Sequence, residues 1–263
     1  MEHGFPEIDH VLAYIQQHLY DPLTLNDLAK QAAYSPYHFT RLFKKRIGVS
    51  PQYYVSVLRL QRAKELLLHT GLSVRDISLE VGQQSLGTFT TRFTERVGVT
   101  PAQFRNSPML AEDHKYTLRH LNNWEQYEMK AGRPVSPHTI EGNVHADQPF
   151  EGVVFIGLFA KPIPERIPLY GTLLFNPGSF RFTNVRPGIY YIMATSMAWD
   201  MQAIDVLLPH NTLRTRSRTP VIVGGSEPVP FQHVQLYPPR IDDPPILISL
   251  PLLMNRFLQR VSN

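Results

Sequence analysis

The chain has 263 residues, of which 43% are hydrophobic, with a net charge of +4 and no cysteine. This length allows one large domain or two ordinary ones with real hydrophobic cores, and the lack of cysteine excludes disulfide scaffolds, cysteine-ligated zinc and thiol catalysis. No apolar run reaches the roughly 18 residues that cross a bilayer. Residues 1–9 lack the basic and apolar regions of a secretory signal. We therefore expect a cytoplasmic protein without a membrane partner.

Helix signals recur through the first hundred residues. Apolar residues at helical spacing predict a first helix over about 7–19, with one stripe packed inward. Thr24, followed three residues later by Asp27, resembles a capping box and predicts a short second helix. A Ser-Pro pair at 35–36 supplies a cap and a first-turn proline, and so predicts a third helix that ends at Gly48.

A second Ser-Pro pair, at 50–51, opens a long helix to about residue 69, and the pattern then starts again. Ser73 and Asp76 repeat the earlier capping pair, and the run Ile-Gly-Val-Ser-Pro at 47–51 returns as Val-Gly-Val-Thr-Pro at 97–101. We infer two copies of one three-helix unit, with one inserted residue near Gly82. The matched positions are Phe39 with Phe89, Thr40 with Thr90, Phe43 with Phe93, and Arg46 with Arg96.

A short capped helix, a tight turn and a second helix with a polar outer face make up the helix-turn-helix plan. The second helix of each copy is the candidate reading helix, because its width fits the major groove of duplex DNA. Two copies joined by a stiff helix can engage successive major-groove segments about 34 Å apart. Residues 1–106 carry 12 basic and 9 acidic side chains, and this excess suits a polyanionic partner.

Residues 8–105 resemble the DNA-binding region of the AraC/XylS family of transcription regulators. The most specific part is 74–105, VRDISLEVGQQSLGTFTTRFTERVGVTPAQFR, with its Phe-x-x-x-Phe reading helix and closing Gly-x-x-Pro-x-x-Phe-Arg. The first copy also fits, through SPYHFTRLFKKRIGVSPQYY. The resemblance implies a sequence-specific, double-stranded-DNA-binding regulator that is not an enzyme and has no cofactor. One departure is Gln83, which stands where an aromatic residue commonly follows the turn glycine.

The polar outer faces of the two reading helices supply the candidate DNA contacts. Arg41 is the candidate base reader, since a guanidinium can bond guanine O6 and N7 together, and a solvated surface charge is the alternative. The second helix is less basic, so we predict that the first copy discriminates more and the second positions more. The complete set is Pro36, Tyr37, Thr40, Arg41, Lys44, Lys45, Ser85, Leu86, Gly87, Thr88, Thr91 and Arg92.

The aromatic residues of this region have two interpretations. They form either a stacking platform for single-stranded bases or the core of the two copies. Helical spacing puts them opposite the polar readers, which favours the core. The residues concerned are Phe39, Leu42, Phe43, Tyr54, Phe89, Phe93 and Phe104.

The predicted organisation is α then β: a double helix-turn-helix domain over 1–107, a linker over 108–150 with one helix at about 112–126, and an antiparallel β-sandwich over 151–263. The run FRFTNVRPGIYYIMA at 180–194 resembles the strand-turn-strand of prealbumin-like or carboxypeptidase-regulatory-like sandwiches, which implies fold and not function. A helix with Leu252 and Phe257 follows Pro251. Predicted strands cover 153–159, 172–175, 180–183, 189–194, 204–207, 221–223, 233–237 and 246–250.

The C-terminal half contains no recognisable catalytic motif. We interpret Asp242 and Asp243 as a solvated loop, not an acid pair. Scattered histidines in the linker are not expected to form a metal site. An arginine triple either binds an anion or discourages edge pairing of strands, and we favour the edge explanation. The histidines are His114, His120, His138 and His145, and the arginines are Arg214, Arg216 and Arg218.

Three functions compete on this sequence. The first is a regulator whose β domain dimerises the protein, senses a small-molecule effector or contacts RNA polymerase. The second is an enzyme acting on DNA or a carbohydrate, with the helical part as a targeting module. The third is a non-specific architectural DNA binder. Paired, capped reading helices favour the regulator.

Overall fold

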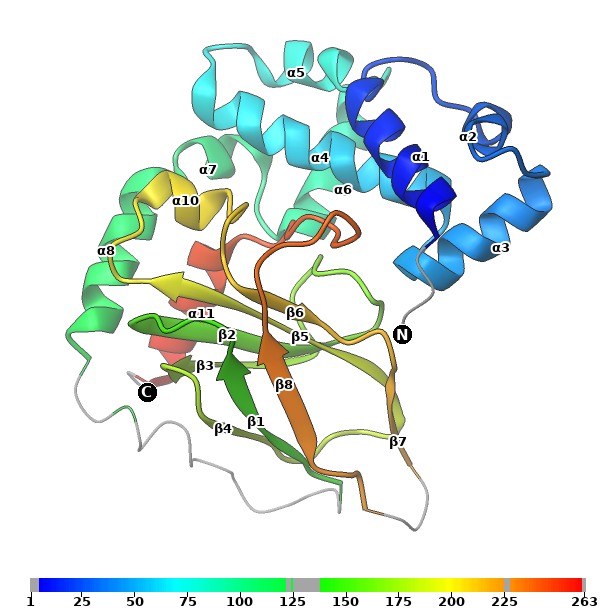
Figure 1. Ribbon diagram of the computed structural model, residues 1–263. Coiled ribbons are helices and arrows are strands. Elements are labelled where there is room, and N and C mark those ends of the chain that lie inside the picture. Colours follow the sequence, from blue (N-terminus) through cyan, green and yellow to red (C-terminus); the bar gives the residue numbers. More distant parts are fainter. Residues whose placement is uncertain (1–4, 122–123, 125–137, 225–227, 262–263) are drawn as a thin grey trace. The chain divides into compact units, whose positions relative to one another are not determined.

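A computed structural model describes residues 5–121, 124, 138–224 and 228–261 of the chain (Figure 1). The chain forms two compact units, which we call the helical unit and the β unit. The helical unit comprises Met1–Arg105 together with the short segments Ile163–Arg166 and Arg240–Ile248. The β unit comprises Asn106–Pro162, Ile167–Pro239 and Ser249–Asn263. No helix among the described residues is long and apolar enough to cross a membrane.

Seven helices of the helical unit follow the predicted order. A Thr or Ser side chain caps the N-terminus of six of them, as the capping signals indicated. Thr24, Ser35, Ser50, Ser73, Ser85 and Thr100 each accept a hydrogen bond from the backbone N–H three residues later. The helices are α1 (Pro6–Gln17), α2 (Leu25–Gln31), α3 (Pro36–Ile47), α4 (Pro51–His69), α5 (Val74–Glu80), α6 (Leu86–Val97) and α7 (Pro101–Arg105).

The two copies share their backbone turns. Gly48 and Gly98 end the reading helices α3 and α6 with φ of 89° and 93°, in the left-handed region that favours glycine. The tight turn within each copy also contains a left-handed residue, Ala33 with φ of 54° in the first copy and Gly82 with φ of 72° in the second. The duplication predicted from the sequence is therefore present at the level of individual dihedral angles.

The two copies also share an aromatic core. In the first copy the Phe43 ring lies 5.5 Å from Phe39 and 5.7 Å from Tyr54, between centroids. In the second, Phe93 lies 5.8 Å from both Phe89 and Phe104. All six are buried, so the core interpretation is confirmed and the stacking platform is wrong. Leu42 is only partly buried, at the edge of the first core.

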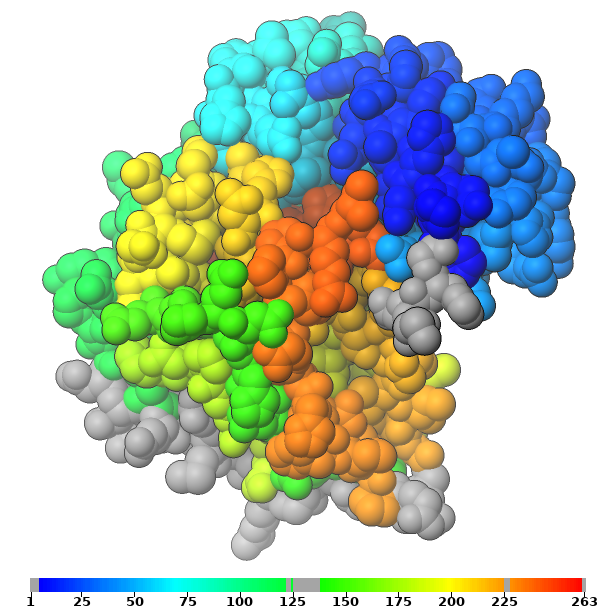
Figure 2. All heavy atoms as spheres, viewed as in Figure 1, coloured from blue at the N-terminus to red at the C-terminus, as the bar shows by residue number. Residues whose placement is uncertain are grey.

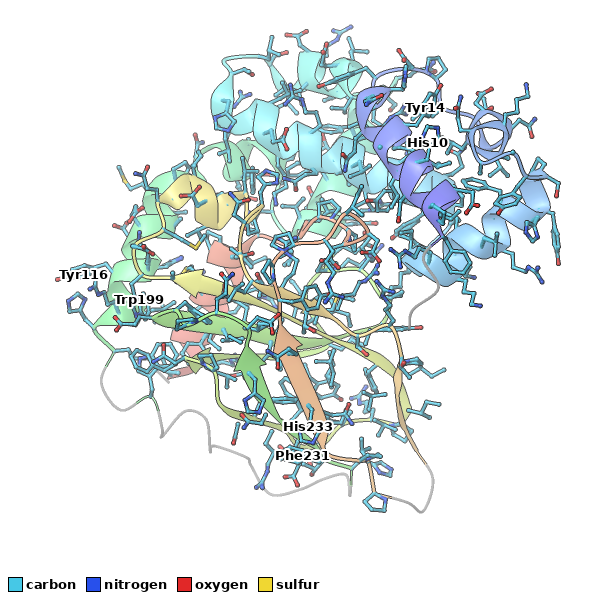
Figure 3. All side chains as sticks on the ribbon, in the orientation of Figure 1. His10, Tyr14, Tyr116, Trp199, Phe231 and His233 are labelled. Carbon is cyan, nitrogen blue, oxygen red and sulfur yellow. The ribbon has the colours of Figure 1, made fainter. Side chains whose placement is uncertain are left out.

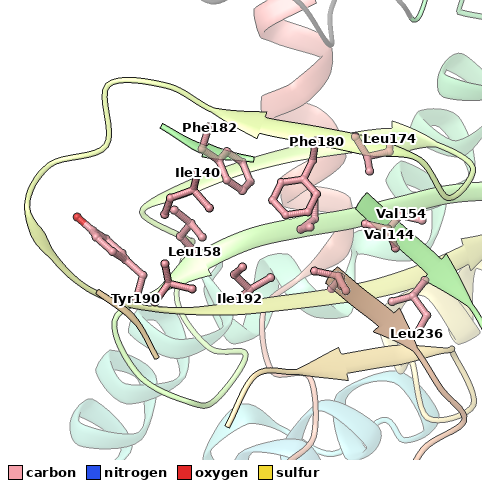
Figure 4. Close-up of a cluster of buried hydrophobic side chains, with 14 of the residues drawn as sticks. Ile140, Val144, Val154, Leu158, Leu174, Phe180, Phe182, Tyr190, Ile192 and Leu236 are labelled. Atoms are coloured by element: carbon pink, nitrogen blue, oxygen red, sulfur yellow. The ribbon is translucent and has the colours of Figure 1, made fainter. Parts of the chain in front are cut away.

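The β unit contains two sheets with their apolar faces in one shared core (Figure 4). One sheet has the order β4-β1-β8 and the other β3-β2-β5-β6, with β7 also paired to β5. Alternation of apolar and polar residues, as in Ile140, Gly142 and Val144 of β1, turns one side of each strand inward. The strands are β1 (Ile140–Ala146), β2 (Gly152–Phe159), β3 (Tyr170–Phe175), β4 (Ser179–Phe182), β5 (Gly188–Ala198), β6 (Arg214–Arg216), β7 (Val221–Val223) and β8 (Gln232–Leu236).

The sandwich differs from the predicted one in pairing. The strand pairs are antiparallel except β1 with β8, which is parallel. β1 was missing from the prediction because the polar composition of 138–148 resembled a linker, although its alternation is regular. Phe231 and His233 lie beside each other at the start of β8, with ring centroids 5.1 Å apart (Figure 3).

Two predicted strands are wrong. Residues 204–207 lie in a short helix, α10 (Ala203–Leu207), because the Asp205 carboxylate accepts a hydrogen bond from the Gln202 N–H at 3.3 Å and caps its first turn. Residues 246–250 form no strand: 246–248 belong to the helical unit and Leu250 begins the C-terminal helix α11 (Leu250–Val261). That helix agrees with the predicted apolar spacing after Pro251.

The region predicted as a linker contains helix α8 (Ser107–Arg119), which starts five residues before the predicted 112 because Pro108 occupies its first turn. The predicted end at 126 lies outside the described residues. α8 packs with α10 and α11 in the β unit. Among the described residues, no three His, Cys, Asp or Glu side chains are placed to hold a metal ion.

β6 is the end strand in the order β3-β2-β5-β6, as the edge explanation expects, but its Arg214 and Arg216 are buried, whereas Arg218 is exposed. Arg214 is 7% exposed and donates to the backbone oxygens of Pro209, His210 and Thr212. Arg216 is 8% exposed, and β6 is hydrogen-bonded to β5. The Arg214 side chain holds the 209–212 turn beside β6, a role that alternation on a strand does not distinguish from edge protection.

Candidate nucleic-acid interface

The outer face of α3 is polar, exposed and basic. Ser35 caps the helix and Pro36 occupies its first turn, so the residues that follow project from a fixed helix start. Tyr37 is 81% exposed. Arg41 is also exposed, and its guanidinium lies 3.4 Å from Nδ1 of His38. Of the six predicted contacts on this helix, five are exposed: Pro36, Tyr37, Arg41, Lys44 and Lys45.

The sixth predicted contact on α3, Thr40, lies differently. It is half-buried, and its hydroxyl donates to the carbonyl oxygen of Pro36 at 2.7 Å. A Thr hydroxyl bonded back to the preceding turn has its proton occupied. Only its methyl group and the oxygen lone pairs remain for a ligand, so Thr40 offers less than its neighbour Arg41.

The outer face of α6 is exposed but has little charge. The Ser85 side chain accepts from the Thr88 N–H at 3.3 Å and caps the helix. Leu86 and Gly87 follow in the first turn, and the smallness of Gly87 leaves open space above the backbone, with nothing within 4 Å of an added Cβ. The six predicted contacts on this helix are all exposed: Ser85, Leu86, Gly87, Thr88, Thr91 and Arg92.

Gln83 has a contact that sequence reasoning missed. Its side-chain oxygen accepts a hydrogen bond from Arg92 at 3.1 Å, across nine residues of the second copy. Its counterpart in the first copy, Tyr34, instead packs its ring against His38, with centroids 4.8 Å apart. The signal in the sequence is that Gln83 stands where an aromatic residue commonly follows the turn glycine. The amide orients the one exposed cation of the outer face of α6.

Arg59 on α4 supports the turn of the second copy. Its guanidinium donates to the carbonyl oxygens of Leu19 at 3.1 Å and Asp21 at 2.9 Å. Burial lowers its pKa. A Cβ at Gly82 would lie 3.1 Å from the same guanidinium, which would have to shift slightly to admit it, and the φ of 72° there favours glycine. One side chain therefore connects the end of α1 to the turn before α6.

The two reading helices thus have the same frame and different electrostatics. The outer face of α3 carries Arg41, Lys44 and Lys45, whereas that of α6 carries Arg92 alone and has the exposed Glu95 near its end. Cations attract the phosphate backbone, and a guanidinium also pairs with guanine. Figure 2 shows the side chains of α1 (dark blue) and α3 (lighter blue) at the surface of the helical unit.

The sequence of the helical unit is similar to known DNA-binding regulators. The helix-turn-helix domain family matches residues 28–107. The HTH-type transcriptional regulator YobQ of Bacillus subtilis is 38% identical over 96 residues, 36% of this chain and 40% of that protein. The bifunctional transcriptional activator and DNA repair enzyme AdaA of the same species is 35% identical over 107 residues, 41% of this chain and 51% of that protein.

A crystal structure of a transcriptional regulator with an AraC-type DNA-binding domain, from Chromobacterium violaceum, is 29% identical. It covers 39% of this chain and 91% of that one, with a TM-score of 0.38. The chain spans about half or less of the length of the two curated relatives. The family match begins inside α2 and ends just after α7, so it contains both reading helices. Residues 28–107 therefore match the helix-turn-helix domain family over both reading helices.

Proposed function

We propose that this protein is a sequence-specific transcription regulator that places α3 and α6 in adjacent major-groove segments of duplex DNA. The observation that carries the proposal is the pair of capped helices, each with a buried aromatic core behind it and an exposed polar face in front. A helix held in this way can enter the major groove without disturbing its own packing. The family match over both helices supports the same function.

Within this proposal the two helices have different tasks. Arg41 reads a base, and Lys44 and Lys45 contact phosphates of the same half-site. The α6 face approaches the backbone closely at Gly87 and contacts thymine methyl groups through Leu86. Base discrimination is therefore greater at the half-site of α3. A cytoplasmic location belongs to the same proposal, because the DNA target lies there.

We propose that the β unit modulates DNA binding, either by joining two copies of the chain or by sensing a small-molecule effector, with RNA polymerase as a further partner. The support is its separate core, which includes both sheets and needs no residue of the helical unit. An enzyme with the helical part as a targeting module is not proposed, because no observation favours it.

Selection of binding sites from random duplexes, followed by a salt titration on the selected and a scrambled duplex, tests the main proposal. We expect the selected duplex to bind about a thousandfold more tightly than the scrambled one at physiological salt. Both affinities should fall with rising salt, because phosphate contacts release counterions. A ratio near one at every salt concentration would show a non-specific binder and end the regulator proposal.

A further inference from the structure

Two short segments from late in the sequence belong to the helical unit. Residues 163–166 lie between β2 and β3, and residues 240–248 lie between β8 and α11. We call them the bridging segments. They lie outside the residues that the helix-turn-helix family matches. One acidic residue from each bridging segment contacts the same arginine position, Arg46 in the first copy and Arg96 in the second.

The second bridging segment holds the end of α3. Asp242 is 2% exposed, and its carboxylate lies 3.4 Å from Nε of Arg46, in the last turn of that helix. The same arginine reaches Asp9 on α1, also at 3.4 Å. A carboxylate so deeply buried is costly unless a cation faces it. Arg46 therefore joins the reading helix, the first helix of its copy and a residue almost two hundred positions later.

The first bridging segment holds the end of α6 in the same way. Glu165 is 4% exposed, lies 3.6 Å from Nε of Arg96 and accepts a hydrogen bond from the Tyr53 hydroxyl on α4. Arg96 also donates to the Ser56 hydroxyl at 2.8 Å. Arg46 and Arg96 are the matched positions of the duplication, so each copy offers the same arginine to a buried acid from a bridging segment.

The two bridging segments are bonded to each other and to α4. The backbone N–H groups of Leu247 and Ile248 donate to the Pro164 carbonyl oxygen at 3.0 Å and 3.3 Å. The buried ammonium of Lys64, on α4, donates to the Ile246 carbonyl oxygen at 2.9 Å. A continuous path of contacts therefore runs from the last turn of α3 to the last turn of α6.

We infer that Glu165 and Asp242 are positioning residues for DNA recognition, because the bridging segments fix the separation of the two reading helices. The inference rests on the proposed function, since a fixed separation matters only if both helices engage one duplex. It adds a determinant of operator spacing outside the helix-turn-helix repeats. Each bridging segment is continuous at both ends with the β unit, which gives that unit a covalent route to the reading helices.

The first experiment measures how binding depends on half-site spacing. The full-length chain and its Glu165→Gln/Asp242→Asn variant are titrated on the selected operator, on operators with one base pair inserted or deleted between the half-sites, and on one isolated half-site. A Glu151→Gln/Asp200→Asn variant is the control, because it removes two exposed carboxylates of the β unit and changes the net charge equally. The unfolding midpoint of each variant is measured in parallel.

We expect the bridging variant to bind the isolated half-site like the parent and the full operator about tenfold more weakly, because a looser connection lowers the effective concentration of the second helix. Its preference for the original spacing should flatten, while the control keeps the parental preference. Unchanged spacing preference in the bridging variant overturns the inference. So does an equal loss on half-site and full operator, which indicates a merely structural role. If the double variant does not fold, Glu165→Gln and Asp242→Asn are titrated separately, and each is expected to flatten the spacing preference and to weaken only full-operator binding.

A second experiment needs no DNA. The chain has no cysteine, so Lys44→Cys on α3 and Thr91→Cys on α6, both exposed, give two clean sites for spin labels. We expect a narrow distance distribution in the parent and a broader one in the bridging variant. Equal distributions overturn the inference. If the parent binds no duplex specifically, the proposed function fails, and this measurement still decides whether the bridging segments position the helices.

Discussion

The two helix-turn-helix copies are alike in frame and differ in what they bury and expose. If Thr24 is matched with Ser73, the buried residues of α1 coincide one by one with buried residues of α4. The inward side of α1 is entirely apolar, whereas that of α4 contains Gln61 and Lys64. The matched pairs are Ile8 with Val57, Val11 with Leu60, Leu12 with Gln61, and Ile15 with Lys64.

The outer faces differ in the opposite sense, since α3 is basic and α6 is nearly neutral. The frame that the copies share consists of helix caps, left-handed turn residues and aromatic triplets, which are local requirements of the fold. The polar pair of α4 has a different cause, because Lys64 bonds to a bridging segment and its counterpart Ile15 does not. The two copies therefore differ where their side chains contact different groups, as Lys64 contacts a bridging segment and Ile15 does not.

The largest expected effect tests the shared frame. Phe43→Ala and Phe93→Ala each remove the central ring of an aromatic triplet, and each should cost about 3–5 kcal/mol of unfolding free energy through lost burial and a cavity. Urea denaturation measures both. Because the triplets are matched, the two costs should agree within about 1 kcal/mol. If only one of the two substitutions lowered the unfolding free energy, the two aromatic triplets would share their geometry but not their contribution to stability.

The next effect tests the buried Lys64 of α4. Burial lowers the pKa of Lys64 to about 7, below its value in the unfolded chain. Between these two values the unfolded state binds more protons, so stability should rise with pH. From pH 7 to pH 9 the gain should reach about 2–3 kcal/mol, at about 1.4 kcal/mol per pH unit. Urea denaturation at several pH values measures it, and Lys64→Met should remove this part of the slope. If Lys64→Met kept the same slope of unfolding free energy against pH, the slope would not come from Lys64.

A third effect tests the outer faces. Arg41→Ala should weaken binding to the selected operator by about 1–3 kcal/mol and relax the sequence requirement at one position. The matched substitution in the second copy, Thr91→Ala, should cost less than about 0.5 kcal/mol, since it removes no charge. Titration against operators with each base pair substituted in turn measures both. Greater sensitivity in the half-site of α6 would reverse the assigned division of tasks.

The smallest effect concerns the turns. Ala33 has the positive φ that its counterpart Gly82 adopts without strain. Ala33→Gly should therefore stabilise the first copy by up to about 1 kcal/mol, because relief of the left-handed strain exceeds the added freedom of the unfolded chain. Thermal unfolding monitored by circular dichroism measures the shift. A destabilised variant would mean that the methyl group contributes more through packing than it costs.

The sequence was sufficient for the helical frame because its determinants are local. Caps, prolines and glycines specify where helices begin and end, and the internal repeat alone makes Phe43 and Phe93 equivalent. Exposure of the predicted contacts on α3 and α6 follows from helical periodicity. Thr40 differs because a hydroxyl can bond to the preceding turn, which periodicity does not reveal.

Local sequence signals do not predict features that depend on contacts between residues far apart in the sequence. Asp242 has the composition of a solvated loop, and only the opposing Arg46 makes it a buried acid. Residues 246–248 have an apolar pattern that fits a strand, but they pack within the helical unit instead. The parallel pairing of β1 with β8 joins segments ninety residues apart, and alternation specifies a face without naming a partner strand.

The sequence positions of the bridging segments have a consequence for biosynthesis. Arg46 and Arg96 leave the ribosome long before Glu165 and Asp242 are made, so a nascent chain of some hundred residues has both helix-turn-helix copies and neither acidic partner. At about 5–20 residues per second this interval lasts on the order of ten seconds. The helical unit is completed only after residue 248 has been translated, and a truncated product carrying only the repeats would lack its final geometry.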